Sequence, residues 1–235
     1  MSAWNRNESW SNPLASGIDL QSIMRQVYTW MVLGMLVTAG IAYITASSPL
    51  LIDLALNPII VLIAVIAELG VVLVISRGLT RLSSVAATML FIVYAALNGF
   101  TLSIVLLAFS LGSVFLAFAS TAALFGVMSV IGYTTKVDLS KMGTYLMMAV
   151  IGLIIAMVIN LFVNSSPLDM LISMAGVLIF TALTAYDTQR IGRMAAGMST
   201  DSESELKFGI FGALQLYLDF INMFLFILRL TGRRR

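Results

Sequence analysis

Three acidic residues lie inside long apolar stretches of the sequence, and these are the side chains best placed to do chemistry. Glu68 lies in the apolar run 59–75, Asp187 near the end of the run 168–191, and Asp219 in the middle of the run 208–230. An ionised side chain at the centre of a bilayer costs at least about 2.5–3.5 kcal/mol on insertion scales. We therefore expect these acids to face the protein interior and to serve the movement of protons or cations.

The sequence contains no histidine and no cysteine. This excludes imidazole bases, His-ligated zinc, thiolate metal sites and cysteine nucleophiles. Two aspartates within the membrane are also found in intramembrane aspartyl proteases. However, the second motif of that class, Gly-x-Gly-Asp, is replaced here by Leu216-Tyr217-Leu218-Asp219. We expect no enzymatic activity and no resident cofactor.

The composition predicts an all-α polytopic membrane protein. Hydrophobic residues make up 60% of the 235 residues and charged residues 10%, against about 45–50% and about 25% in soluble domains. A span needs roughly 20 apolar residues. We expect a mobile polar N-terminal tail over 1–22, and then a single seven-helix domain over 23–235 with spans at 27–46, 59–75, 84–109, 114–133, 143–163, 168–191 and 208–230.

The basic residues predict the orientation. They fall in the N-terminal tail and in every second loop, namely at Arg6, Arg25, Arg77, Arg81, Lys136, Lys141, Arg190, Arg193 and Lys207. This pattern places the N-terminus in the cytoplasm. The C-terminal arginines, from Arg229 to Arg235, disagree with a seventh crossing. We nevertheless expect a full crossing, because the last segment is long enough and topology is usually set early in the chain.

Polar residues recur at helical spacing around the acids and predict inward-facing polar seams. The seams are Gln215, Asp219 and Asn222; Thr181, Thr184, Asp187 and Thr188; and Tyr94, Asn98 and Thr101. Other interpretations remain open. The threonines could bond to the backbone, Asp187 could neutralise Arg190 or Arg77, and Glu68 could be a protonated structural group.

If Asp187 and Asp219 meet in a dry site, both cannot be ionised. The pair then titrates as a unit and can hold one proton, and once deprotonated it can bind a hard cation through oxygen ligands. Contact requires the sixth span to extend to about Met194 or the seventh to begin nearer Ala213.

Two segments resemble the Bax inhibitor-1 family (transmembrane Bax-inhibitor-motif proteins), in its bacterial branch. They are Thr184-Ala185-Tyr186-Asp187-Thr188-Gln189 and Leu216-Tyr217-Leu218-Asp219-Phe220-Ile221-Asn222. The resemblance implies a seven-helix fold with the last helix central, and a pH-sensitive calcium leak. It also implies Asp187 and Asp219 as the pH sensor and calcium contacts, Glu68 along the ion pathway, and Arg77 or Arg81 as a salt-bridge partner.

The sequence therefore favours a pH-gated cation leak, most simply for Ca²⁺, with Asn98, Thr184, Gln215 and Asn222 supporting the acids. Two alternatives use the same residues: a proton-coupled exchanger of a cation or a small solute, and a regulator that contacts other membrane proteins. The expected partners are the lipid bilayer, Ca²⁺ and H⁺. A net charge of +2, with the basic residues scattered over loops, gives no footprint for nucleic acid.

Overall fold

The computed structural model describes residues 20–78, 82–196 and 202–233, and these ranges are built almost entirely of α-helix. The helices, in chain order, are α1 (Leu20–Ser47), α2 (Pro49–Leu56), α3 (Pro58–Gly78), α4 (Ser84–Ala108), α5 (Leu111–Thr134), α6 (Met142–Val163), α7 (Ser166–Ala196) and α8 (Ser202–Thr231). Within the described ranges, seven of them are long and apolar enough to cross a membrane. The predicted all-α, seven-span architecture is confirmed.

The short helix α2 is the one element that the span pattern did not predict. It begins at Pro49, and α3 begins at Pro58, so a proline occupies the first turn of each helix. Proline suits this position because its fixed φ is helical and its missing N–H is not needed there. The Asn57 side chain accepts from the backbone N–H of Ile59 at 3.0 Å, which caps the start of α3.

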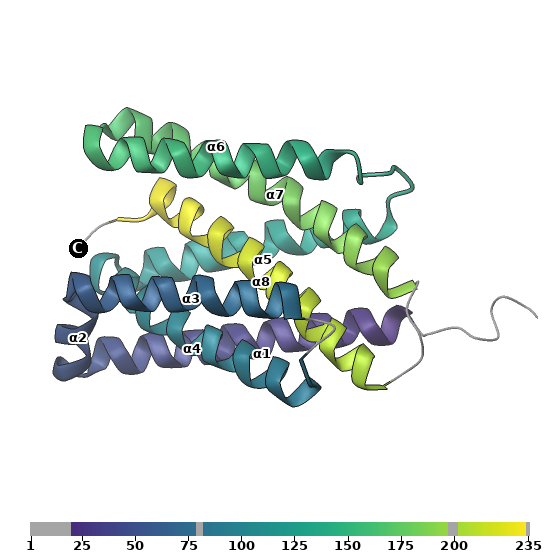
Figure 1. Ribbon diagram of the computed structural model, residues 1–235. Coiled ribbons are helices and arrows are strands. Elements are labelled where there is room, and N and C mark those ends of the chain that lie inside the picture. Colours follow the sequence, from purple (N-terminus) through teal and green to yellow (C-terminus); the bar gives the residue numbers. More distant parts are fainter. Residues whose placement is uncertain (1–19, 79–81, 197–201, 234–235) are drawn as a thin grey trace, which may run out of the picture.

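Helix α8 lies at the centre of the bundle, as expected. It runs diagonally between α6 and α7 on one side and α1, α3 and α4 on the other (Figure 1). It packs directly on α1, α4, α5 and α7, and Leu216, Tyr217 and Met223 are fully buried. Helix α6 is peripheral, since no Cα atom of α6 lies within 8 Å of one in α8 over the described ranges.

The bundle has two distinct ends. We call the end where α1 begins the proximal end, and the end that holds α2 the distal end (Figure 1). Helix α8 finishes at the distal end, where the Arg233 backbone N–H donates to Ser113 Oγ at 3.0 Å and the Ser110 N–H donates to the Arg233 carbonyl at 3.1 Å. The last helix therefore runs the full length of the bundle, as the expected seventh crossing requires.

Two helix boundaries differ from the predicted spans. Helix α1 begins at Leu20, inside the expected tail, while residues 1–19 lie outside the described ranges. Helix α7 continues to Ala196, beyond the predicted end at 191. Charged residues end the apolar run but not the helix, because Arg193 and Gln189 bond to the neighbouring loop and hold these last turns in place.

Candidate functional site

The structure brings the two membrane-embedded aspartates together. Asp187 of α7 is 6% exposed and Asp219 of α8 is 4% exposed, and the two carboxyl groups lie close enough for a side-chain hydrogen bond between them. Two carboxyl groups can form such a bond only when one of them carries a proton, because an ionised carboxylate has no donor. One condition for this contact was that the sixth span extends to about Met194. This condition is met, because α7 continues to Ala196.

A basic residue also approaches the pair. Arg190 Nη1 lies 3.9 Å from Asp187 Oδ1, one helical turn away on α7. Arg77 was a candidate for this role, but it is exposed and forms no ion pair with any described residue. The other candidate, Arg81, lies outside the described residues. Arg190 is therefore the basic residue that lies beside the aspartate pair. It is one of the two arginines whose charge we expected Asp187 to neutralise in the alternative interpretation.

The aspartate pair lies on a longer seam between α7 and α8. On α7, one face carries a set of residues at intervals of three and four: Asp169, Ser173, Gly176, Phe180, Thr184 and Asp187. On α8, which runs antiparallel, the corresponding face carries Asp219, Met223, Phe226 and Arg229. These faces define what we call the α7–α8 seam.

Aromatic rings close the middle of the α7–α8 seam. The rings of Phe180 and Phe226 stack with their centroids 5.9 Å apart and an interplanar angle of 26°. Both side chains are buried, as is Met223 beside them. Gly176 makes room for this arrangement, because a Cβ atom at that position would meet the Phe226 ring at 2.5 Å. The pair of phenylalanines is therefore a tight apolar plug.

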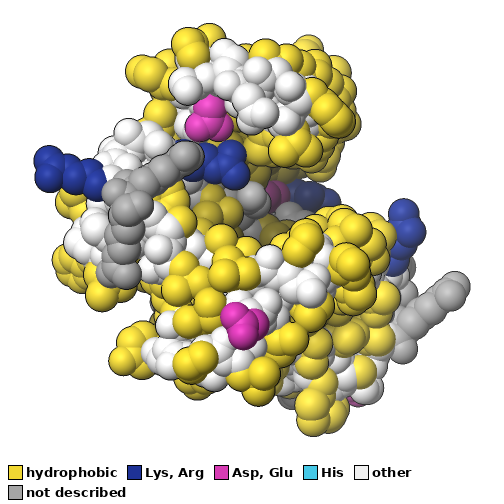
Figure 2. All heavy atoms as spheres, turned by 90° about the vertical axis from the view of Figure 1, so that its left-hand side faces the viewer, with side chains coloured by type: hydrophobic (Ala, Val, Ile, Leu, Met, Phe, Trp, Pro, Cys, Tyr) yellow, Lys and Arg dark blue, Asp and Glu magenta, His cyan; other side chains and the backbone are white. Residues whose placement is uncertain are grey.

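The distal end of the seam is polar and open. A hollow of about 340 Å³ lies between α6, α7 and α8, and its polar lining comes from Asn160, Asn164, Asp169 and Arg229. Viewed from the distal end, the molecule is largely hydrophobic and is visibly hollowed between its two halves (Figure 2). The seam thus has polar groups at both ends and an apolar plug between them.

Glu68 belongs to a separate polar cluster that is not in contact with the aspartates. It is half-buried and accepts from Thr101 Oγ1 at 2.9 Å and from Asn98 Nδ2 at 3.5 Å. The buried hydroxyl of Tyr217 donates to Asn98 Oδ1 at 3.2 Å and lies 2.6 Å from Thr38 Oγ1. This cluster therefore links α3 and α4 to α1 and α8.

Most of the remaining predicted supporting residues form hydrogen bonds with groups other than the aspartates. The Thr184 hydroxyl donates to the Phe180 carbonyl, and the Asn222 amide donates to the Leu218 carbonyl, both at 2.8 Å. Asn98 supports Glu68 instead of the aspartate pair. Gln215 is half-buried, and its side chain makes no hydrogen bond to another described residue. For Thr184, the alternative interpretation of backbone bonding holds, and Asn222 bonds to the backbone as well.

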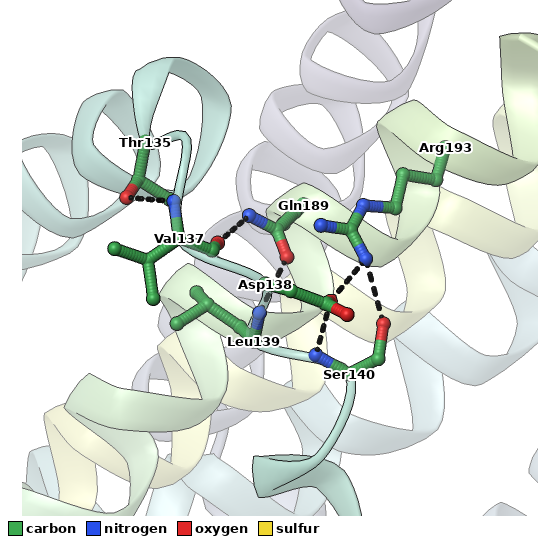
Figure 3. Close-up of polar contacts among 7 residues, drawn as sticks. All are labelled: Thr135, Val137, Asp138, Leu139, Ser140, Gln189 and Arg193. Carbon is green, nitrogen blue, oxygen red and sulfur yellow. Dashed lines mark hydrogen bonds and ion pairs between the residues drawn. The ribbon is translucent and has the colours of Figure 1, made fainter.

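Sequence reasoning missed a polar clamp on the loop between α5 and α6. Gln189 accepts from the Leu139 N–H at 2.9 Å and donates to the Val137 carbonyl at 2.8 Å. One turn later, Arg193 donates to the Asp138 carboxylate and to Ser140 Oγ. Figure 3 shows both side chains reaching from α7 to this loop. We call this set the loop clamp; its sequence signal is a Gln and an Arg at i and i+4, two and six residues after Asp187.

The loop clamp also fixes the charge of Asp138. The backbone N–H of Ser140 donates to Asp138 Oδ1 at 3.0 Å. This bond and the Arg193 guanidinium hold the pKa of the Asp138 carboxyl well below its usual range, since both stabilise the ionised form. The clamp is therefore a charged structure at every pH at which proteins normally work.

The fold and the site together define a multi-pass helical membrane protein with a carboxyl pair buried between its last two helices. Residues 20–235 match the family described as inhibitor of apoptosis-promoting Bax1, and the chain belongs to that family.

Bacterial relatives match nearly the whole chain. The inner membrane protein YbhL of Escherichia coli is 43% identical over the full length of both chains. An uncharacterized protein of Deinococcus radiodurans is 45% identical over 92% of each chain. One of Borreliella burgdorferi is 42% identical over 90% of this chain and 92% of its own. The family assignment made from the two aspartate segments is confirmed.

Proposed function

We propose that this protein is a pH-sensitive cation leak of the bacterial inner membrane, with Ca²⁺ as the permeant ion and the Asp187–Asp219 pair as its gate. The inner-membrane location follows that of the Escherichia coli relative. The distribution of Lys and Arg places the proximal end in the cytoplasm. The observation that carries the proposal is the buried contact between two carboxyl groups at the interface of two spanning helices.

The closed state holds the shared proton. With one proton between them, Asp187 and Asp219 bond to each other and keep α7 against α8. The plug formed by Phe180 and Phe226 then separates the carboxyl pair from the distal hollow. Apolar constrictions of this kind block ions because water does not wet them.

Loss of the shared proton opens the path. It leaves two adjacent negative charges in a site with little water, and like charges in such a site repel. The repulsion acts across the α7–α8 seam, so it loosens the packing that holds the plug. The freed carboxylates also present oxygen ligands, which hard cations such as Ca²⁺ prefer.

Calcium is the cargo of this path and not a resident ion. Ca²⁺ usually takes six to eight oxygen ligands, whereas the described residues contain no cluster of three or more acidic side chains. Two carboxylates suit brief binding during passage better than tight retention. Glu68, half-buried on α3, would provide a second carboxylate step in the pathway through its own polar cluster.

Flux into proteoliposomes loaded with a calcium-sensitive dye tests the proposal. Wild-type protein should give a Ca²⁺ leak that increases as the pH is raised. Asp187→Asn and Asp219→Asn should each abolish the pH dependence, because an amide cannot release the proton. Asp53→Asn, on α2 and outside the seam, is the matched control and should behave as wild type.

Two results would contradict the proposal. One is a wild-type flux that does not respond to pH, and the other is an unchanged pH response in Asp219→Asn. Uphill Ca²⁺ accumulation driven by an imposed pH gradient would instead assign the protein to the exchangers.

A further inference from the structure

Helices α1 and α5 leave an open groove between them. Both pack on α8, but no Cα atom of α1 lies within 8 Å of one in α5 over the described ranges. The groove at the proximal end has a volume of about 540 Å³, and its walls include Met24 and Tyr28 of α1 and Phe125 and Tyr133 of α5. We call this space the α1–α5 groove; its lining is almost wholly apolar.

A polar pocket adjoins the α1–α5 groove at the proximal mouth. It lies between the ends of α5 and α7 and has a volume of about 400 Å³. Its polar lining comes from Thr135, Thr188, Gln189 and Arg193, and Tyr133 lines both spaces. We call it the head pocket. The aspartate pair does not line it, so the head pocket is separate from the gate.

Two buried hydroxyl groups on these walls have no protein partner. Thr188 is fully buried in the wall of the head pocket, and Ser129 is 6% exposed in the wall of the groove. Neither hydroxyl has a hydrogen-bond partner among the described residues. Two other buried threonines, Thr121 and Thr184, bond back to the carbonyl four residues earlier. An unpaired buried hydroxyl is costly, so a ligand oxygen that reached either wall would stabilise it. Ser173 and Thr181, elsewhere on α7, also have unpaired hydroxyls.

Arg193 supplies a positive charge at the same pocket. Its contacts with Asp138 and Ser140 both use Nη1, so among the described residues the other N–H groups of the guanidinium have no hydrogen-bond acceptor. A guanidinium binds phosphate oxygens through several N–H groups at once. Basic pockets between spanning helices are a common way to hold the head group of an anionic lipid.

The α1–α5 groove covers most of the depth of one leaflet. Its α5 wall runs from Phe125 to Tyr133, which is about 12 Å at 1.5 Å per residue, and one leaflet of a hydrocarbon core of about 30 Å is about 15 Å deep. Deeper in the bundle, Phe118 lines a separate apolar cavity of about 120 Å³ between α1, α4, α5 and α8. The polar mouth and apolar depth match the two parts of a phospholipid.

We propose that the head pocket and the α1–α5 groove together bind one anionic phospholipid, with its phosphate at Thr188 and Arg193 and an acyl chain between α1 and α5. This goes beyond the ion leak and does not depend on it, because the binding site excludes both aspartates and binding is measured without any flux.

Native mass spectrometry of the full-length protein in mixed micelles tests the proposal. Dioleoyl phosphatidylglycerol and dioleoyl phosphatidylcholine would be supplied in equal amounts. Wild type should retain one phosphatidylglycerol in preference to phosphatidylcholine. Thr188→Val should weaken retention about fivefold, the effect of one hydrogen bond. Arg193→Gln should weaken it about tenfold and remove the preference for the anionic lipid.

Matched variants separate loss of binding from loss of folding. At Gly126 in the groove and Gly192 in the head pocket, an added Cβ would meet no atom within 4 Å. Leucine at either position should therefore fill the space, leave the fold intact and displace the lipid. Gly152→Leu, equally open but on the lipid-facing side of α6, should retain the lipid. Thr184→Val should also retain it.

Three outcomes would overturn the proposal. The first is equal retention of the two lipids by wild type. The second is unchanged phosphatidylglycerol binding in both Gly126→Leu and Gly192→Leu. The third is full competition by glycerol 3-phosphate alone, which would show a site for a free phosphate ester with no role for the acyl chain.

Discussion

Phe180 of α7 and Phe226 of α8 stack at 5.9 Å between the buried Asp187–Asp219 pair and the open hollow at the distal end. The two rings are the largest apolar obstacle along the α7–α8 seam. Because one ring lies on each helix, any loosening of α7 against α8 separates the rings. The carboxyl pair, which joins the same two helices, can therefore control whether the plug is closed.

Phe226→Ala is expected to raise Ca²⁺ flux at acidic pH, where the wild type is closed. Removing the ring leaves the plug half empty and allows water to enter the seam. If the stacked pair contributes about 1.4 kcal/mol to closure, the flux should rise about tenfold. Proteoliposome flux at a fixed acidic pH measures the effect.

Phe220→Ala is the control for this variant. Phe220 is equally buried on α8, but it packs on Phe118 and Phe125 of α5, on another face of the helix. Its removal should cost similar stability without opening the seam. Equal flux increases in the two variants would show that general loosening of α8, and not loss of the plug, opens the path.

Gly176→Ala is expected to destabilise the protein by about 1–3 kcal/mol, the usual cost of overpacking. The added methyl would collide with the Phe226 ring, for which the structure leaves no space. Thermal unfolding in detergent measures the change. Gly152→Ala, where a Cβ meets no atom within 4 Å, should be neutral or slightly stabilising. A loss of stability as large at Gly152 would contradict the steric explanation.

Tyr217→Phe is expected to lower stability by about 1–3 kcal/mol, because it leaves buried polar partners unpaired. The Tyr217 hydroxyl bridges Thr38 of α1 and Asn98 of α4, and Asn98 in turn holds Glu68. Thermal unfolding again gives the measurement. Tyr145→Phe, at a site 72% exposed, should have no effect. An unaltered melting temperature for Tyr217→Phe would show that the cluster does not support the fold.

Asp138→Asn is expected to weaken the loop clamp equally at about pH 5 and about pH 8. A carboxyl whose pKa is lower in the folded state adds stability above its unfolded pKa, and this stability is lost as the pH falls through the folded value. The pKa of Asp138 is held well below its usual range. The ion pair with Arg193 is therefore fully formed across this interval and is lost only in stronger acid.

Hydrogen exchange of the loop at residues 135–141 measures the strength of the clamp in this variant. The pH midpoint of Ca²⁺ flux should stay at the wild-type value, because Asp138 does not titrate in the working range. A shifted midpoint in Asp138→Asn would place part of the pH response in the loop clamp and not in the aspartate pair.

Sequence patterns predicted the architecture well because the bilayer imposes it. A span must satisfy its backbone internally and must be apolar for about 20 residues, so hydropathy alone located all seven helices. Boundaries were less certain. The polar end of α7, to Ala196, is held by contacts of Gln189 and Arg193 with a loop some 50 residues earlier, and no local pattern reports such contacts.

The candidate site, like the fold, was predicted only in part from the sequence. The rarity of acids within apolar runs singled out Glu68, Asp187 and Asp219 from the sequence alone. Their grouping was decided by the packing of the helices. Asp187 meets Asp219, whereas Glu68 lies in another cluster with Asn98 and Tyr217.

The sequence by itself determined that this chain crosses a membrane seven times and which few charges it keeps within the bilayer, because lipid excludes unpaired polar groups whatever the fold. Only the tertiary structure decided which of those groups touch, where Phe180 and Phe226 close the seam, and where α1 and α5 leave space. These features depend on how the helices cross and how far apart they lie, and side-chain packing between distant segments sets both.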